Sequence, residues 1–265
     1  MKKSFGQHLL TDKNYLKKIV DAIDLKSDDI VLEIGAGSGL LTKLLARKVK
    51  KVYAVEIERE IIKQLKENIE LERLTNVEIL EINFLKIDLH KFSPFKIVGN
   101  IPYNITSQIL LKLFGEIDKP ASHLQVLKNV YLMLQLEVAQ RVVAKPNTKA
   151  YSPLTLLIQY FTEPKILFKV PRNVFFPIPK VDSAFVVFHP KEKSEQVQNP
   201  AFLKNIIRVA FQQRRKKIIN SLGKLIEDKK DIIEVLDKLH LDCSLRAENL
   251  SIDDYMAITN NIYAK

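Results

Sequence analysis

A cluster of glycines marks the first place where this chain could bind a ligand. Three of its seven glycines fall within five residues, directly after a short apolar run: Gly35, Gly37 and Gly39. An apolar run followed by glycines and then by helical spacing predicts a strand-to-helix turn. Glycine lets a ligand approach the backbone closely, which favours a binding loop over a plain tight turn. A dinucleotide fingerprint needs its third glycine at position 40, where Leu40 stands, and this argues against NAD.

An acidic side chain stands at the end of the next predicted strand. Residues 52–56 form a second short apolar run, and Glu56 is its last residue. The geometry that places an acidic residue on the ribose in dinucleotide sites would let Glu56 accept hydrogen bonds from ribose hydroxyls. The alternative is a surface charge beside Glu58 and Glu60, but the strand end next to the glycine loop favours the site.

The sequence Asn-Ile-Pro-Tyr follows a third predicted strand, residues 96–100. Ligands of open α/β sheets bind at the carboxyl ends of the strands. There the side-chain oxygen of Asn100 and the backbone carbonyl of Ile101 could both accept hydrogen bonds from one exocyclic NH₂ group. Tyr103 could stack on the plane of a base. Asn-x-Pro is also typical of a plain turn, so the motif taken alone leaves both interpretations open.

The elements that must position these residues alternate between strands and helices, which predicts an α/β fold with a parallel sheet covered on both sides. The polar stretch 191–200 is interpreted as a linker between an α/β domain, residues 1–190, and a smaller all-helical domain, residues 191–265. Strands are predicted at 30–34, 52–56, 77–80, 96–100 and 130–135, with a closing strand pair at 165–170 and 183–188. A first helix is predicted after Asp12, with Leu16, Ile19, Val20 and Ile23 on its buried face. A long helix is predicted to begin at Pro200, with Asn199 as its cap, and to run through Gln212 and Arg215. Further helices are predicted at 40–49, 58–72, 105–114, 152–162, 229–240 and 251–262.

Composition limits the class of protein. Hydrophobic residues at 46% and charged residues at 28% are typical of a globular chain rather than a disordered or collagen-like one. The single cysteine, Cys243, excludes an internal disulfide and favours a reducing cytoplasm. The N-terminal residues lack the apolar region of a signal peptide, and no apolar run reaches the roughly 18 residues of a membrane span, so we expect no membrane association. The histidines are scattered and neither HxxxH nor CxxC occurs, so no metal site is expected.

The positive charge of the chain is concentrated in its middle. The formal net charge is +11, from 42 Lys+Arg and 31 Asp+Glu. Residues 101–217 hold 18 basic and 7 acidic side chains, a net +11, whereas residues 1–100 and 218–265 carry +3 and −3 and cancel. A surface formed from the middle stretch is therefore predicted to face a polyanion.

Taken together, the glycine loop, the strand-end Glu56 and the Asn-Ile-Pro-Tyr motif resemble class I S-adenosylmethionine-dependent methyltransferases that act on an amine. Five segments in order make the chain similar, over residues 5–251, to the family of small-subunit ribosomal RNA adenine N6,N6-dimethyltransferases: FGQHLL (5–10), NIPYNITS (100–107), FFPIPKVDS (175–183), FQQRRK (211–216) and RAENLS (246–251). The resemblance implies a Rossmann-like class I methyltransferase sheet, S-adenosylmethionine as methyl donor with S-adenosylhomocysteine as product, and no metal. It also implies small-subunit ribosomal RNA and the assembling small subunit as partners, and dimethylation of two adjacent adenosines in a 3′-terminal hairpin loop; we expect a monomer.

Carried over by position, the resemblance implies a cofactor site in which Glu56 holds the ribose and Asn83 the adenine amine. The family usually has Asp at the position of Asn83, and an Asn oxygen can still accept that hydrogen bond, without charge assistance. His8 stands where Asn is common, and Ala36 where Pro is common. The full set is Gln7, His8, Leu10, Gly35, Gly37, Glu56, Asn83 and Asn100.

The implied catalytic group is Asn100, Ile101, Pro102, Tyr103 and Phe176. Acceptors on Asn100 and Ile101 would hold the adenine amine so that its lone pair points at the methyl group. Positioning and electrostatics would then carry most of the catalysis. Phe176 would cover the base opposite Tyr103, with packing in the core as the alternative for this ring. Reaching an adenine requires its extrusion from any stack, which is easiest in a single-stranded loop.

A basic segment is the predicted contact with RNA phosphates. Residues 204–217 contain no acidic residue, and three of their basic residues, Lys204, Arg208 and Arg215, would share a stripe on the predicted helix. The alternative is a solvated helix face. The six basic residues are Lys204, Arg208, Arg214, Arg215, Lys216 and Lys217.

Two other functions remain open on the sequence. One is a macrolide-resistance-type methyltransferase of large-subunit ribosomal RNA, which shares the NIPYNI segment. The other is a ribosome-assembly or RNA-binding factor that keeps the fold without catalysis, although such a protein has no use for a cofactor loop. The segments FGQHLL and RAENLS favour the small-subunit enzyme.

Overall fold

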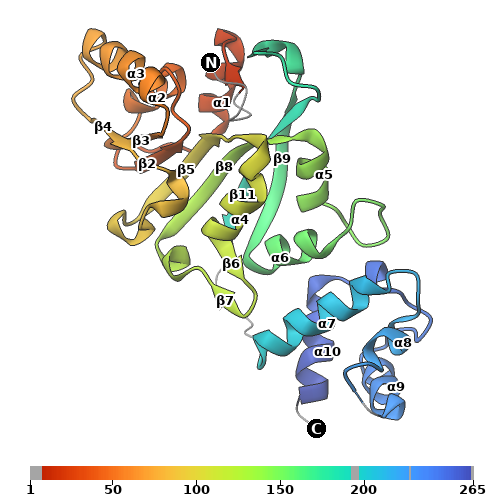
Figure 1. Ribbon diagram of the computed structural model, residues 1–265. Coiled ribbons are helices and arrows are strands. Elements are labelled where there is room, and N and C mark those ends of the chain that lie inside the picture. Colours follow the sequence, from red (N-terminus) through yellow and green to blue (C-terminus); the bar gives the residue numbers. More distant parts are fainter. Residues whose placement is uncertain (1–7, 192–196, 227, 264–265) are drawn as a thin grey trace. The chain divides into compact units, whose positions relative to one another are not determined.

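The computed structural model describes residues 8–191, 197–226 and 228–263 (Figure 1). Their contacts divide the chain into two compact units. The sheet unit comprises the chain up to Phe114, Ala121–Ala139 and Pro164–Pro190, and the helical unit comprises Gly115–Pro120, Gln140–Glu163 and the chain from Lys191 onward. This division differs from a single boundary at residue 190, because side chains such as Ile117, Tyr151 and Leu156 are buried in one cluster with the C-terminal helices.

The sheet unit is built on seven strands in the order β4-β3-β2-β5-β8-β11-β9. The first five of these pair in parallel, whereas β11 runs antiparallel to β8. The sheet is therefore mixed rather than wholly parallel, and the predicted closing pair forms its last two strands. The bounds are β2 (Ile30–Ile34), β3 (Lys51–Glu56), β4 (Val77–Glu81), β5 (Phe95–Asn100), β8 (Leu127–Gln135), β9 (Thr162–Val170) and β11 (Ser183–Pro190).

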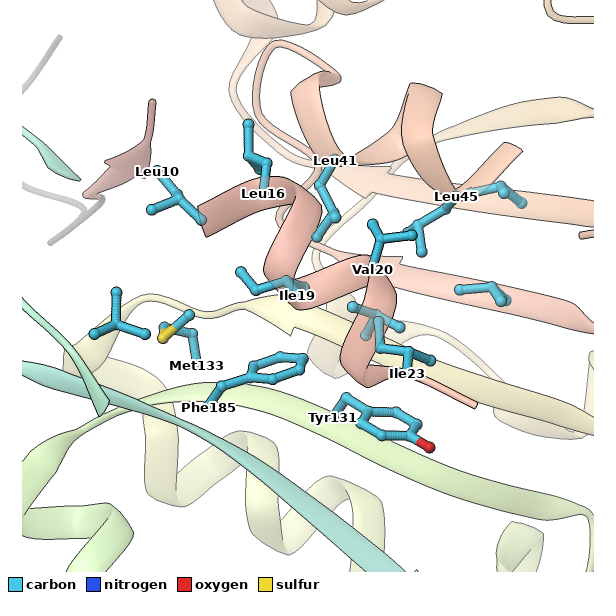
Figure 2. Close-up of a cluster of buried hydrophobic side chains, with 14 of the residues drawn as sticks. Leu10, Leu16, Ile19, Val20, Ile23, Leu41, Leu45, Tyr131, Met133 and Phe185 are labelled. Carbon is cyan, nitrogen blue, oxygen red and sulfur yellow. The ribbon is translucent and has the colours of Figure 1, made fainter. Parts of the chain in front are cut away.

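Helix α1 (Lys13–Ala22), a helix that the sequence predicts, packs against one face of this sheet. It begins at Asp12, whose carboxylate accepts hydrogen bonds from the backbone N–H groups of Asn14 and Tyr15, at 2.8 and 3.0 Å. Figure 2 shows its apolar face, on which Ile19 lies over the ring of Phe185, while Ile23, the residue directly after the helix, lies over the ring of Tyr131. Each fully buried aliphatic side chain of this kind stabilises the fold by about 2 kcal/mol.

The remaining elements include several that the sequence did not predict, among them the two-residue strands β1 (Leu9–Leu10) and β10 (Phe175–Phe176) and the helices α5 (Leu136–Val142) and α8 (Ile218–Leu222). The predicted long helix through Arg215 is wrong. Helix α7 (Pro200–Gln212) ends at Gln212 because Gln213 leaves the helical conformation, with φ −124° and ψ 46°. The other bounds are α2 (Leu40–Ala46), α3 (Arg59–Leu71), α4 (Thr106–Phe114), β6 (Gly115–Glu116), β7 (Lys119–Pro120), α6 (Pro153–Phe161), α9 (Lys229–Lys238) and α10 (Ile252–Tyr263).

A buried ion pair ties β5 to the loop before β2. The ammonium of Lys96 lies 2.7 Å from a carboxylate oxygen of Asp29 and also donates to the carbonyl of Asp24. Burial raises the pKa of Asp29, but hydrogen bonds from Lys96, the Lys26 backbone and Lys128 outweigh it and hold that pKa below its usual value. The buried carboxylate is therefore charged and depends on these donors.

Replacing Lys96 by methionine is expected to lower the free energy of unfolding by about 3 kcal/mol, because it leaves Asp29 charged and buried with fewer donors. Urea unfolding at neutral pH measures the change. The matched control is Lys66→Met, which breaks an exposed pair with Glu81 (2.6 Å) and should change stability by less than about 1 kcal/mol. Equal losses from the two variants would contradict the special role of the buried pair.

Candidate active site

The glycine loop follows β2 and turns back on the sheet. Gly35 and Gly37 have φ angles of +72° and +57°, which L side chains rarely adopt, so a side chain at either position would strain the backbone. The backbone N–H groups of Gly35 and Ala36 both donate to the carbonyl of Val55, at 3.0 Å. These two N–H groups are used within the protein and are therefore not available to bind an anion.

Glu56 fastens this loop to the end of β3. Its buried carboxylate accepts hydrogen bonds from the backbone N–H of Gly37 (3.0 Å), Ile57 (2.8 Å) and Glu58 (3.1 Å). A carboxylate has about four lone-pair sites, so one remains for a ligand hydroxyl. The arrangement is compatible with the predicted ribose contact.

A cavity opens beside the loop, at the carboxyl ends of β2 and β5. Four of the predicted cofactor residues line it, namely Leu10, Gly35, Gly37 and Asn100. A Cβ atom on Gly35 would lie 3.4 Å from the backbone oxygen of Asn100, so the two strand ends face each other closely here. Glu56, His8 and Asn83 are not among its lining residues, and Gln7 lies outside the described residues.

The short strands β1 and β10 bring the N-terminal segment to the Phe-Phe-Pro segment. Leu9 pairs with Phe176 and Leu10 with Phe175 in antiparallel register. Next to this ladder, Nδ1 of His8 lies 2.7 Å from the carbonyl oxygen of Pro177, which can only accept, so the imidazole donates. The pairing carries no periodic sequence signal because each strand has two residues, and sequence analysis missed it.

This ladder also fixes the orientation of Asn100. The carbonyl oxygen of His8 lies 2.7 Å from Nδ2 of Asn100 and can only accept a hydrogen bond, so the NH₂ end of the amide must face it. The other end, Oδ1, is thereby left as an acceptor. An adenine amine offers the hydrogens that such an acceptor can bind.

Two aromatic side chains accompany Asn100. The hydroxyl of Tyr103 lies 2.5 Å from Oγ of Ser183, and its ring centroid lies 5.3 Å from that of His8. Burial raises the pKa of Tyr103 although the Ser183 contact lowers it, so the phenol stays neutral. Phe175 is 2% exposed and belongs to the core, whereas Phe176 is 66% exposed, so Phe176 is the ring that can meet a ligand.

Glu33 is a cavity residue that sequence analysis missed. It is buried on β2, lines the cavity and accepts a hydrogen bond from the Thr42 hydroxyl at 2.6 Å. Burial, with a further contribution from the charge of Glu56 and against the Thr42 hydrogen bond, raises the pKa of Glu33 to about 8. The signal that could have found it is a lone acidic residue inside the apolar run Ile-Val-Leu-Glu-Ile.

Asn83 follows β4 and caps a short 3₁₀ turn, residues Phe84–Lys86. Its Oδ1 accepts from the backbone N–H of Leu85 at 3.0 Å. One lone pair of this oxygen remains for the predicted contact with the adenine amine, which stays a prediction.

The basic segment does not form one charged stripe. In the helical unit the ammonium of Lys204 pairs with Glu116 (2.5 Å) and Asp118 (2.9 Å), and Nε of Arg214 pairs with Glu248 (2.5 Å). Arg208 donates to Asn205. Arg215, Lys216 and Lys217 lie in the turn after α7, are exposed, and form no ion pair with any described residue. The turn is held where Lys217 forms an antiparallel bridge with Arg246.

The described ranges contain no group of three or more His, Cys, Asp or Glu side chains arranged to hold a metal ion. Nor does any helix within those ranges have the length and apolar character needed to cross a bilayer.

Comparisons with known proteins agree over almost the whole chain. The sequence model of a family described as "Ribosomal RNA adenine dimethylase" matches residues 1–264. Two proteins named "Ribosomal RNA small subunit methyltransferase A" are similar to this chain. The one from Acaryochloris marina is 38% identical, covering 99% of this chain and 97% of its own, and the one from Francisella tularensis subsp. novicida is 37% identical, covering 98% and 96%.

Solved structures resemble the fold as well. A dimethyladenosine transferase from Plasmodium falciparum has a TM-score of 0.80 at 32% identity and covers 95% of this chain and 96% of its own. The 23S rRNA methyltransferase ErmE has a TM-score of 0.76 at 25% identity and covers 96% and 99%.

Proposed function

The chain belongs to the ribosomal RNA adenine dimethylase family, and from that membership we propose that it transfers methyl groups from S-adenosylmethionine to the N6 amines of two adjacent adenosines in the 3′-terminal hairpin loop of small-subunit ribosomal RNA. The observation that carries the proposal is the orientation of Asn100, whose Oδ1 is free to accept from an amine because its Nδ2 donates to His8. The partner in the cell would be the assembling small subunit.

The residues at the strand ends fit S-adenosylmethionine, which supplies an electrophilic methyl group when bound. Glu56 retains a lone pair for a ribose hydroxyl, and Gly35 and Leu10 line the adjoining cavity. No phosphate has to be bound, which agrees with a glycine loop whose first N–H groups are used internally. Asn83 would contact the adenine ring of the cofactor.

The chain's part in the reaction is to orient the target amine. Its two hydrogens would be held by Oδ1 of Asn100 and the carbonyl of Ile101, which turns the lone pair toward the methyl group. A methylated amine cation is very acidic, so no dedicated base is needed. Asn100 cannot act as one, and Tyr103 is a neutral phenol. Pro102 fixes the backbone between the two acceptors and Tyr103.

The base itself would lie between two rings. Tyr103 offers one face and the exposed Phe176 the other, an arrangement worth about 1–3 kcal/mol per stacked base. An adenine can reach this place only after it leaves its own stack, which is least unfavourable in a loop.

For the RNA backbone we propose the exposed residues Arg215, Lys216 and Lys217, together with Arg208, as phosphate contacts. Lys204 and Arg214 could join them only by releasing their carboxylate partners. These partners lie outside residues 204–217 and therefore could not be found by inspecting that segment alone.

The decisive experiment is transfer of tritiated methyl groups to undermethylated small subunits and, separately, to large subunits, followed by digestion to nucleosides. We expect N6,N6-dimethyladenosine from small subunits only. Label in large subunits alone would support the macrolide-resistance-type alternative. No label in either, with RNA binding intact, would support the non-catalytic RNA-binding factor.

Replacing Glu56 by glutamine is expected to weaken S-adenosylmethionine binding about 100-fold, because the charge-assisted hydrogen bond to the ribose is lost and an amide NH₂ meets backbone donors. Calorimetric titration with S-adenosylmethionine and with S-adenosylhomocysteine measures the loss. Glu60→Gln, an exposed neighbour on α3, is the matched control and should bind normally. Unchanged affinity of the Glu56 variant would contradict the ribose role.

A further inference from the structure

One short segment of the sheet unit exposes an unusual amount of apolar surface. Nine large hydrophobic side chains are exposed among the described residues, and three of them fall within residues 176–181. Phe176, Ile178 and Val181 are 66%, 62% and 43% exposed. Exposed hydrophobic side chains that stand singly need no explanation, but a group of them marks an interaction site.

The backbone holds these side chains outward. Pro177 and Pro179 restrict the chain on either side of Ile178, and Pro179 is itself buried. The carbonyl of Lys180 accepts from the guanidinium of Arg172 at 3.2 Å. Next to it, the carboxylate of Asp182 accepts from the Arg172 backbone at 3.0 Å. The segment is therefore fastened at both ends rather than free to fold its apolar side chains inward.

This segment begins at the candidate base site. Phe176 pairs with Leu9 in the β1–β10 ladder, and the carbonyl of Pro177 accepts from His8. The carbonyl of His8 in turn accepts from Asn100. Ile178 is thus the first residue beyond the group of contacts that orients the proposed amine acceptor.

Extrusion of an adenine leaves a gap between its former neighbours in the stack. Proteins that kink a duplex insert apolar side chains, isoleucine and proline among them, between stacked bases. An apolar side chain would fill the gap left by the adenine in the same way. Phe176 is already assigned to the target base itself, so Ile178 and Val181 are the exposed apolar side chains left to fill the gap. Between them stands Lys180, exposed and positively charged, which complements a phosphate backbone rather than an uncharged apolar partner.

We propose that Ile178 and Val181 form an apolar wedge that enters the RNA stack where the target adenosine has left and keeps that adenosine extruded. The proposal rests on the proposed function, since it assigns a role in reaching the same adenosine. It differs from a role in the base pocket, because a wedge matters only when the target starts out stacked.

The test compares Ile178→Ala/Val181→Ala with the unchanged protein on two RNAs: a hairpin in which the target adenosines are stacked, and a short single strand with the same local sequence. On the hairpin we expect kcat/KM to fall about tenfold or more, since unstacking must then occur without the wedge. On the single strand we expect no change. With 2-aminopurine at the target position of the hairpin, the fluorescence rise on binding should be lost in the double variant.

Two further variants calibrate the result. Leu71→Ala removes an 80% exposed leucine at the end of α3 and should change nothing on either RNA. Phe176→Ala should lose activity on both RNAs, as expected of a residue that stacks on the target base.

Three outcomes would overturn the wedge. Unchanged kcat/KM on the hairpin means that the apolar pair is not used, and an equal loss on both RNAs places it in the base pocket. A dimer of the unchanged protein in sedimentation that the double variant loses would assign the patch to a second copy of the chain. The fluorescence measurement does not require methyl transfer, so a failure of the proposed function would be recognised separately.

Discussion

Replacing Asn100 by alanine is expected to lower kcat about 10³-fold while RNA affinity changes by no more than a few fold. Oδ1 of Asn100 would touch the target amine in the reacting arrangement, and the loss of one such preorganised polar contact typically slows a reaction 10²–10³-fold. The larger value applies here because the same side chain also donates to the carbonyl of His8, which would lose its partner. Single-turnover methyl transfer measures the rate, and filter binding measures RNA affinity.

Asn14→Ala provides the matched control, because Asn14 is an exposed asparagine on α1. It should retain full turnover. A normal rate in the Asn100 variant would contradict the contact with the amine. So would a rate loss that disappears at saturating RNA and cofactor, since the residue would then serve binding alone.

The positions of the candidate site residues along the sheet could be predicted from the sequence. The glycine loop, Glu56 and Asn100 each follow a short apolar run, and parallel strands bring their carboxyl ends to one edge. The orientation of Asn100 could not be predicted. It depends on the pairing of β1 with β10, which are far apart in the sequence and too short to show a period.

The charge pattern shows a different limit. Residues 204–217 contain no acid, yet Lys204 pairs with Glu116 and Asp118, 88 and 86 residues earlier. A window along the chain counts neighbours in sequence, whereas ion pairs form between neighbours in space. The end of α7 at Gln212 could not be predicted either, because no glycine or proline marks that end of the helix in the sequence.

The pKa of Glu33 makes stability depend on pH in a defined direction. Its ordinary value is 4.5, and burial raises it to about 8 in the folded protein. Below pH 4.5 the carboxyl is protonated in both states and its burial carries no charge penalty. Between these two values the folded state holds a proton that the unfolded state releases, so the free energy of unfolding falls by up to about 1.4 kcal/mol per pH unit. Above pH 8 the whole loss, about 5 kcal/mol, is present.

Replacing Glu33 by glutamine should remove this dependence. The amide oxygen can still accept from Thr42, and no charge has to be buried. Urea unfolding of both proteins between pH 5 and pH 9 should give curves that lie close together at the acid end and diverge steadily as the pH rises, the variant becoming the more stable. Glu67→Gln, on the exposed face of α3, should instead follow the unchanged protein throughout. If the curve of the Glu33 variant instead stays parallel to that of the unchanged protein, the Glu33 carboxyl is ionised in the folded protein at all these pH values. A cation in the cavity or a rearranged β2 would then compensate its charge.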